Sequence, residues 1–306
     1  MSKKIISLAA GMAMIGGVAM SDTPKVAADI SPVHSLVSRV MLGVGTPDLI
    51  VQAGASPHGY TLRPSEAKAL QDAQMVFWMG ESLSPWMEGA LDTLSSDATI
   101  ITLLERDETI LMQFREGALF EEHDHDDHGD HEDHGSHDPH AWLSPDNARI
   151  WLNLIASQLS IVDPENAGTY FANAAAARLE IEALTIEVNS LLEPVRGKKF
   201  IVFHDAYQYF EKAFDLSASG AISLGDASKP SPARIAEIQG RIQEESIDCV
   251  LSEPQFNKGL VATVMAGSKA KTSVIDPLGV GLKPGPDLYS ELIRNMTKTL
   301  VDCFES

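Results

Sequence analysis

The stretch "PENAGTYFANAAAARLEIEALTIEVNSLL", residues 164–192, sets the architecture of this chain. It contains no proline after its first residue and is rich in alanine, leucine and glutamate, which favour a helix. Its length predicts one continuous helix of about 43 Å. A flexible hinge would instead be rich in glycine and serine. We therefore predict a stiff helix that holds the two halves of the molecule at a nearly fixed angle.

Short β-rich runs alternate with amphipathic helical patterns on both sides of this helix, and most of the helical patterns open with serine or proline. The predicted strands are "KVAAD", "DLIVQ", "MVFWMG" and "TIITL" before it, and "KKFIVFH", "SASGAISL", "DCVLSEP" and "KTSVIDP" after it. This alternation is typical of α/β proteins. We predict two lobes with parallel β-sheets flanked by helices, joined by the long helix, with a ligand site in the cleft between them.

The N-terminal residues have the pattern of a secretory signal. Lys3 and Lys4 precede the apolar run "IISLAAGMAMIGGVAM", which is too short to cross a bilayer, and Ala19 and Ser21 suit the positions before a cleavage site. We therefore expect an exported protein. The predicted divisions are a signal peptide over 1–21, an N-terminal α/β lobe over 22–163, a connecting helix over 164–193 and a C-terminal α/β lobe over 194–306.

The charge of the chain indicates the class of ligand, and its cysteine content indicates a disulfide. The 306 residues carry a formal net charge of −20, which disfavours nucleic acid and anionic membrane surfaces and suits a cationic ligand. The two cysteines are Cys249 and Cys303. In an exported protein an even pair favours one disulfide, with free thiols or a pair of zinc ligands as the alternatives.

Three histidines and one aspartate stand where ligand-binding residues of α/β proteins usually lie. His58, His204 and Asp276 end or follow predicted strands, and His140 precedes a helix that starts near Pro145. Three imidazoles and a carboxylate form a tetrahedral shell suited to zinc rather than to magnesium or calcium. Taken singly, each residue is more often structural, so spacing by itself does not decide between these roles.

The tract at residues 121–138 contains only histidines, acidic residues, glycines and a serine. Because it has no apolar side chain to bury, we predict a loop that is disordered without metal and binds metal more weakly than a preorganised cleft. Two interpretations remain open: delivery of zinc to the cleft, or a solvated insert with incidental metal affinity. The candidate secondary ligands are His123, His125, His128, His131, His134 and His137.

Five blocks in fixed order carry a family resemblance: "GASPHGYTLRPSEAKAL", "DPHAWLSPDNARI", "FHDAYQYFEKAF", "SEPQF" and "IDPLG". From about Val26 to the C-terminus the chain resembles the ZnuA family, the zinc-binding solute receptors of ABC-type metal uptake systems. The resemblance implies a periplasmic receptor, not an enzyme, that binds Zn²⁺ as its transported ligand. It also implies an ABC permease in the inner membrane as partner, and accounts for a histidine-rich insertion before "DPHAW".

Carried over residue by residue, the resemblance assigns metal ligation to His58, His140 and His204. Manganese-binding relatives have a glutamate at the third position, so the histidine there favours zinc. Some zinc-binding members have a glutamate beside the first histidine, where this chain has Pro57. The fourth position then falls to Asp276, to a water, or to each in turn, and we prefer Asp276.

The resemblance also implies that Cys249 and Cys303 form a disulfide, because they lie in the segment before "SEPQF" and in the final helix. We interpret His34 as structural and Glu253 as a hydrogen-bonding residue of the cleft. The alternative functions are a periplasmic zinc buffer or chaperone without a permease, and a zinc hydrolase with metal-activated water. We expect a monomer, no nucleic-acid partner, and a periplasmic zinc chaperone as a further candidate partner.

Overall fold

The computed structural model describes residues 23–115, 120, 137–223, 230–255 and 258–305. The predicted signal peptide over 1–21 lies outside these residues, as do five of the six candidate secondary ligands, His123, His125, His128, His131 and His134. These predictions therefore stay predictions.

The N-terminal lobe is built on a sheet of four parallel strands in the order β2-β1-β3-β4. All four residues of β3, "MVFW", are buried, which is the pattern of a strand covered on both faces. The elements of this part are β1 (Val26–Ala28), α1 (Ser31–Val40), β2 (Asp48–Leu49), α2 (Pro64–Asp72), β3 (Met75–Trp78), α3 (Pro85–Leu94), β4 (Thr99–Thr102) and α4 (Pro145–Val162).

The C-terminal lobe repeats this plan, with four parallel strands in the order β6-β5-β7-β8. All five residues of β5 are buried at the centre of the lobe. Its elements are β5 (Phe200–His204), α6 (Gln208–Phe214), β6 (Ala221–Ser223), α7 (Pro232–Glu244), β7 (Cys249–Ser252), α8 (Lys258–Val264), β8 (Lys271–Val274) and α9 (Leu288–Glu305). The predicted fold class, two parallel sheets flanked by helices, is confirmed.

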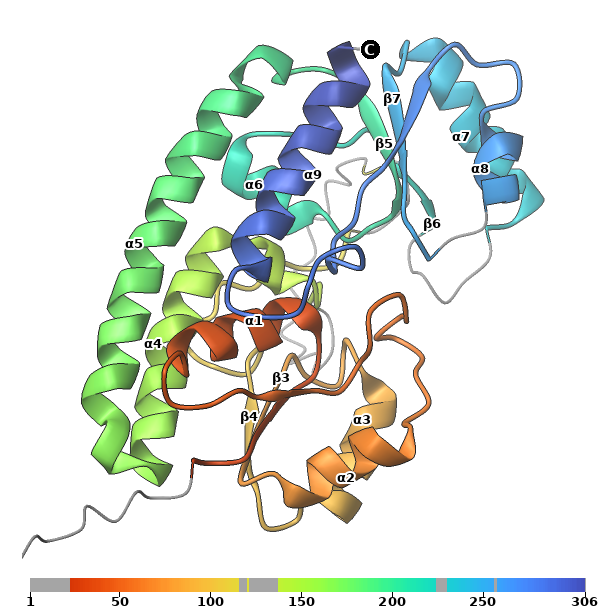
Figure 1. The fold of residues 1–306 in the computed structure, drawn as a ribbon. Helices are drawn as coiled ribbons and strands as arrows, with labels where there is room; N and C mark the ends of the chain where they lie inside the picture. Colours follow the sequence, from red (N-terminus) through yellow and green to blue (C-terminus); the bar gives the residue numbers. More distant parts are fainter. Residues whose placement is uncertain (1–22, 116–119, 121–136, 224–229, 256–257, 306) are drawn as a thin grey trace, which may run out of the picture.

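The predicted connecting helix is α5 (Ala167–Leu192), which runs along both lobes (Figure 1). A 3-10 turn at Pro164–Asn166 precedes it and another at Glu193–Val195 follows it. It packs against α4, α9 and α1, and its buried face repeats every three or four residues: Tyr170, Ala174, Ala177, Ile181, Leu184, Val188 and Leu192. One buried apolar cluster contains this face together with Phe77 of the first sheet and Leu251 of the second. The two lobes therefore share one core, which the long helix spans.

Cys249 and Cys303 form a disulfide that joins β7 to α9, with Cα atoms 6.1 Å apart, as the family resemblance implied. Both cysteines are buried. Among the described residues, no helix combines the length and the apolar character that crossing a membrane requires.

The elements differ from the prediction in three places. Helix α6 was not predicted. The pattern of residues 257–270, "NKGLVATVMAGSKA", predicts one helix, but helix α8 ends at Val264 and the chain then turns through Gly267, whose φ is +79°. The end of the histidine-rich tract is ordered rather than disordered, because His137 forms a β-bridge with Gln113 and Asp138 donates its backbone N–H to the Met112 carbonyl oxygen, 2.8 Å away.

Candidate metal centre

His58 lies in the loop that follows β2, and the start of α3 holds this loop in place. The carbonyl oxygen of Pro57 accepts hydrogen bonds from the Ser84 hydroxyl (3.1 Å) and the Trp86 indole N–H (2.7 Å). The His58 backbone N–H donates to the Ser56 hydroxyl oxygen (3.2 Å), and the histidine is half-buried. The N-terminal lobe therefore presents this imidazole from a braced loop rather than from a strand.

His140 lies between the insertion and α4 and is only 4% exposed. Its backbone N–H and its Nδ1 both contact Oδ1 of Asp138, at 2.9 and 2.7 Å. The ring of Trp142 packs beside it with centroids 5.2 Å apart, and the Trp142 indole donates to the Pro277 carbonyl oxygen (2.9 Å). Contacts from both lobes thus hold this histidine.

His204 is the last residue of β5, at the carboxyl end of the second sheet, and is 3% exposed. Its Nδ1 contacts Oε1 of Glu253 at 2.5 Å, and Glu253 follows the neighbouring strand β7. The other oxygen of Glu253 accepts from Gln255 Nε2 (2.8 Å). The hydrogen-bonding role expected for Glu253 is confirmed, and its partner is a predicted metal ligand.

These three histidines converge although they are far apart in the sequence. One potential ligand atom from each of His58, His140 and His204 lies within 4.8 Å of those of the other two. Nε2 of His140 and Nε2 of His204 are 3.4 Å apart. Nitrogens bound tetrahedrally to one zinc at about 2.0–2.1 Å lie about 3.3–3.4 Å from each other. The pair is therefore already spaced as two ligands of a single zinc ion.

Asp276 follows β8 and is not a member of this three-histidine group. Its Oδ1 accepts the backbone N–H of Leu278 (3.1 Å) and of Gly279 (2.9 Å), and its Oδ2 has a longer contact with the N–H of Gly281 (3.4 Å). Burial, followed by the charges of Glu253 and Asp276, raises the pKa of Tyr207, whose ring lies 6.3 Å from that of His204. Asp276 therefore lies within electrostatic reach of the site, and its ligand role stays a prediction.

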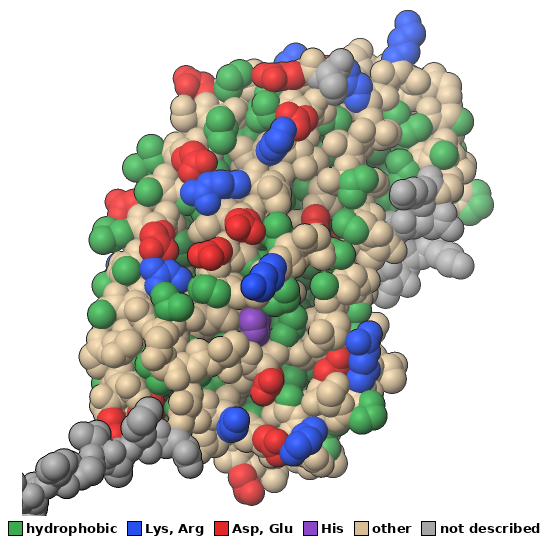
Figure 2. Space-filling view, viewed as in Figure 1, with side chains coloured by type: hydrophobic (Ala, Val, Ile, Leu, Met, Phe, Trp, Pro, Cys, Tyr) green, Lys and Arg blue, Asp and Glu red, His purple; other side chains and the backbone are tan. Residues whose placement is uncertain are grey.

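Two other described histidines lie outside the group. His34 is buried on α1, and its Nε2 contacts the Pro47 carbonyl oxygen at 3.0 Å, so its structural role is confirmed. Burial lowers the pKa of His34. His137 faces Gln113, with Nε2 atoms 3.2 Å apart. On the face in Figure 2, acidic and basic side chains are interspersed and little histidine surface is visible.

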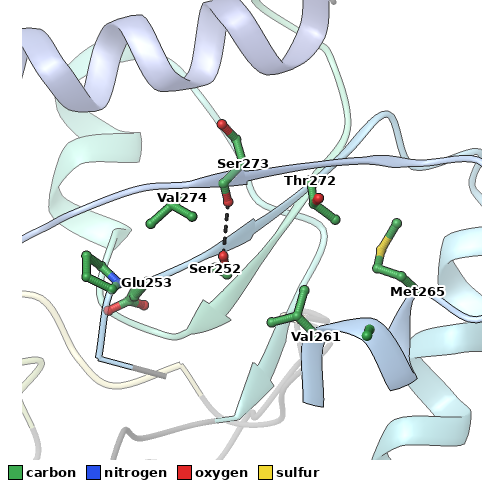
Figure 3. Close-up of a pocket in the computed structure, with 9 residues that line it drawn as sticks. Ser252, Glu253, Val261, Met265, Thr272, Ser273 and Val274 are labelled. Atoms are coloured by element: carbon green, nitrogen blue, oxygen red, sulfur yellow. Dashed lines mark hydrogen bonds between the residues drawn. The ribbon is translucent and has the colours of Figure 1, made fainter. Parts of the chain in front are cut away.

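Glu253 also lines a cavity of about 660 Å³ between β7, β8 and α8 (Figure 3). Its lining includes the apolar residues Val261, Met265 and Val274, and the Ser252 hydroxyl donates to the Ser273 carbonyl oxygen at its wall (3.2 Å). This chiefly apolar lining does not suit a divalent cation, so the histidine group is the candidate metal centre.

Sequence reasoning missed two features of the site. Asp138 was counted among the solvated acids of the tract, although it is 1% exposed. Burial favours its neutral form, but His140 and the hydrogen bonds to the carboxylate outweigh this and lower the pKa of Asp138. Arg115 was not singled out, yet it bonds both Asp205, next to His204, and Glu211. The sequence signal for Asp138 was its place two residues before the predicted ligand His140, separated by one proline.

Known proteins resemble this chain over nearly its full length. Residues 26–303 match the family model of ZnuA, "Zinc-uptake complex component A periplasmic". The chain is 43% identical over 303 residues to the high-affinity zinc uptake system protein ZnuA of Brucella abortus (strain 2308), with 91% of each chain covered. It is 42% identical over 318 residues to the protein of the same name from Paracoccus denitrificans (strain Pd 1222), with 97% of this chain and 96% of that protein covered.

Two solved structures share the fold. A crystal structure of ZnuA has a TM-score of 0.77 at 22% identity and covers 92% of this chain and 99% of its own. The structure of the solute-binding protein FpvC from Pseudomonas aeruginosa in complex with Mn²⁺ has a TM-score of 0.78 at 20% identity, with the same coverage. At this identity the likeness shows the two-lobed architecture.

Proposed function

We propose that this chain, which belongs to the ZnuA family of periplasmic zinc-uptake components, is the receptor that captures Zn²⁺ and delivers it to an ABC permease. The observation that carries this function is the pair of facing Nε2 atoms of His140 and His204 at 3.4 Å, with a ligand atom of His58 within 4.8 Å of both residues' ligand atoms. The closeness of three imidazoles from separate segments supports one shared metal site.

The ligands in this proposal are His58, His140 and His204, with Asp276 in the fourth position. Neutral imidazole nitrogens suit zinc, and the family pattern at position 204 agrees with this choice. Oδ2 of Asp276 has one long backbone contact and retains lone pairs for a metal. We expect Asp276→Asn to weaken zinc binding. An unchanged zinc affinity in that variant assigns the fourth position to water.

A receptor that delivers its cargo needs a site that binds zinc and then releases it. The hydrolase alternative requires a free general base beside metal-bound water. Glu253, the candidate for that base, instead contacts Nδ1 of His204. The family is one of solute-binding receptors, and an esterase assay of the zinc-loaded protein checks the hydrolase directly.

The proposal also covers the location of the protein, its further partners and the role of the histidine-rich insertion. We propose that residues 1–21 direct the chain to the periplasm, that the mature protein is a monomer, and that a periplasmic zinc chaperone is a candidate additional partner. We also propose that the histidines of the insertion, His123, His125, His128, His131, His134 and His137, form a weaker secondary site. Deleting residues 121–136 should leave the high-affinity stoichiometry unchanged and slow zinc transfer at low zinc. An unchanged transfer rate removes the delivery role.

The decisive experiment is a competitive zinc titration of the mature chain against a chromophoric chelator. We expect one high-affinity site, which is strongly weakened by His58→Ala, His140→Ala or His204→Ala. His137→Ala is the matched control, because that histidine lies near the site but outside the group, and it should retain wild-type affinity. Thermal melting without metal checks that each variant folds. Uptake of zinc by vesicles that contain the permease then distinguishes a transport receptor from a zinc buffer.

A further inference from the structure

The carboxylate of Asp138 is placed to control the orientation of His140. Its side chain is 2% exposed, and Oδ1 contacts both Nδ1 (2.7 Å) and the backbone N–H (2.9 Å) of His140. A carboxylate accepts hydrogen bonds, so the proton of a neutral imidazole lies on Nδ1 in this arrangement. Nε2 then keeps its lone pair, and it is this atom that faces Nε2 of His204.

Asp138 is itself fixed by helix α6, which directly follows the strand that carries His204. Its Oδ2 accepts a hydrogen bond from Gln208 Nε2 (3.2 Å), and its carbonyl oxygen accepts one from the Tyr209 hydroxyl (2.9 Å). The Tyr209 hydroxyl also accepts the Met112 backbone N–H (2.9 Å). The segment that carries His140 is thereby tied to the C-terminal lobe.

His204 has an equivalent arrangement, with the buried Glu253 on its Nδ1. Two facing imidazoles are therefore each oriented by a carboxylate on the side away from the other ring. Each carboxylate also places a negative charge across its imidazole ring from the space between the two Nε2 atoms. Such carboxylates fix the tautomer of a ligating histidine and raise its basicity.

We propose that Asp138 is a positioning residue of the zinc site. It selects the Nδ1–H tautomer of His140, holds the Nε2 lone pair toward the shared centre, and partly balances the charge of the cation. This inference rests on the proposed zinc-capture function. Loss of a carboxylate in this position lowers metal affinity about 10–100-fold.

The test combines zinc affinity with the tautomeric state of His140. In the metal-free wild type, ¹⁵N–¹H correlation spectra of the imidazoles should show His140 protonated on Nδ1. Asp138→Ala should lower zinc affinity about 10–100-fold and shift His140 toward the Nε2–H form. Asp138→Asn keeps an oxygen that can accept from Nδ1, so it should preserve the tautomer and lose less affinity. Gln208→Met removes the donor to Oδ2, together with its hydrogen bond to the Gln113 carbonyl oxygen, and should cause a smaller loss in the same direction.

Asp163→Asn is the matched control for loss of a buried aspartate. Asp163 is 3% exposed and lies just past the far end of α4, about 27 Å along that helix from its first residue. This variant should bind zinc as the wild type does, even if its melting temperature falls. The tautomer measurement separates the two roles, because a purely structural role for Asp138 would lower stability without moving the His140 proton.

Wild-type affinity in a folded Asp138→Ala variant, or an Nε2–H tautomer at His140 in the wild type, overturns the inference. If Asp138→Ala does not fold, Asp138→Asn and Gln208→Met decide: the inference fails if both bind zinc as tightly as the wild type. Failure of the zinc-capture function itself gives a different result, because the wild-type chain would then lack a tight zinc site.

Discussion

Replacing Arg115 with methionine removes the cation that neutralises two buried carboxylates beside the metal centre. Its Nε donates to both oxygens of Asp205 at 3.0 Å, and its Nη1 and Nη2 donate to Glu211 at 2.9 and 3.0 Å. The Asp205 and Glu211 side chains are 5% and 6% exposed, and that of Arg115 is 17% exposed. Removing one partner of such a buried pair costs about 3–5 kcal/mol of unfolding free energy.

The pH dependence of this loss follows from Asp205. Burial raises the pKa of Asp205, while hydrogen bonds from Arg115 and its charge oppose that rise. Without Arg115 the folded-state pKa rises further above the unfolded value of about 3.9. Between the unfolded-state and the folded-state pKa of Asp205, the folded protein then binds more protons than the unfolded protein. The free energy of unfolding of the variant therefore falls as pH rises through this range. The deficit should therefore be larger at pH 7.5 than at pH 5.

Urea denaturation of the variant and the wild type at both pH values measures this deficit. Arg294→Met is the control, because Arg294 pairs with Glu187 at the surface, where their side chains are 45% and 43% exposed. An exposed pair of this kind contributes at most about 1 kcal/mol. The reasoning is refuted if Arg115→Met costs no more than Arg294→Met, or if its deficit is the same at pH 5 and pH 7.5.

Three further predictions concern other parts of the molecule. Replacing both Cys249 and Cys303 with alanine should lower the free energy of unfolding by about 4 kcal/mol, because the disulfide closes a loop with a sequence separation of 54. Denaturant unfolding measures this loss of stability. A loss smaller than that of the Arg294→Met control contradicts the prediction. Burial raises the pKa of the Asp29 carboxyl group to about 7, despite hydrogen bonds from the Met79 and Ile30 backbone N–H groups. Below this pH the folded protein therefore keeps the carboxyl group protonated. The stability of Asp29→Asn relative to the wild type should therefore improve as pH rises from 5 to 8 in denaturant melts, and a constant difference rules this out. Trp86→Phe removes the indole hydrogen bond to the Pro57 carbonyl oxygen that braces the His58 loop, and it should weaken zinc binding in a chelator competition. The control Trp151→Phe loses a hydrogen bond to Thr109 and should leave zinc binding unchanged.

The elements that sequence analysis predicted correctly are those with strong local patterns. The alanine-rich stretch that forms α5 repeats its apolar positions over many turns, and most of the strands in the described residues lie in short apolar runs with clear breaks. Helix α6 was missed because it is only seven residues long and follows directly on a strand. The end of α8 was placed too late because its amphipathic pattern continues beyond Val264, where the backbone leaves the helix.

The histidines of the candidate site could be predicted from the sequence, whereas the surroundings of their rings could not. His58, His140 and His204 could be named from their places in ordered sequence blocks, and the structure brings them together. The environment of each ring could not be predicted. Asp138 belongs by composition to an acidic tract, and Arg115 reaches partners 90 and 96 residues away. Such pairings depend on tertiary folding, so no local pattern in the sequence indicates them.

The most direct test of the account is zinc K-edge X-ray absorption of the protein loaded with one equivalent of Zn²⁺. The variant that lacks residues 121–136 should be used, so that five of the six histidines of the insertion cannot contribute. We predict three imidazole nitrogens at about 2.0–2.1 Å from the zinc and one additional light ligand. A spectrum with sulfur ligands, with oxygen ligands alone, or with fewer than three imidazoles contradicts the claim that His58, His140 and His204 bind one zinc ion.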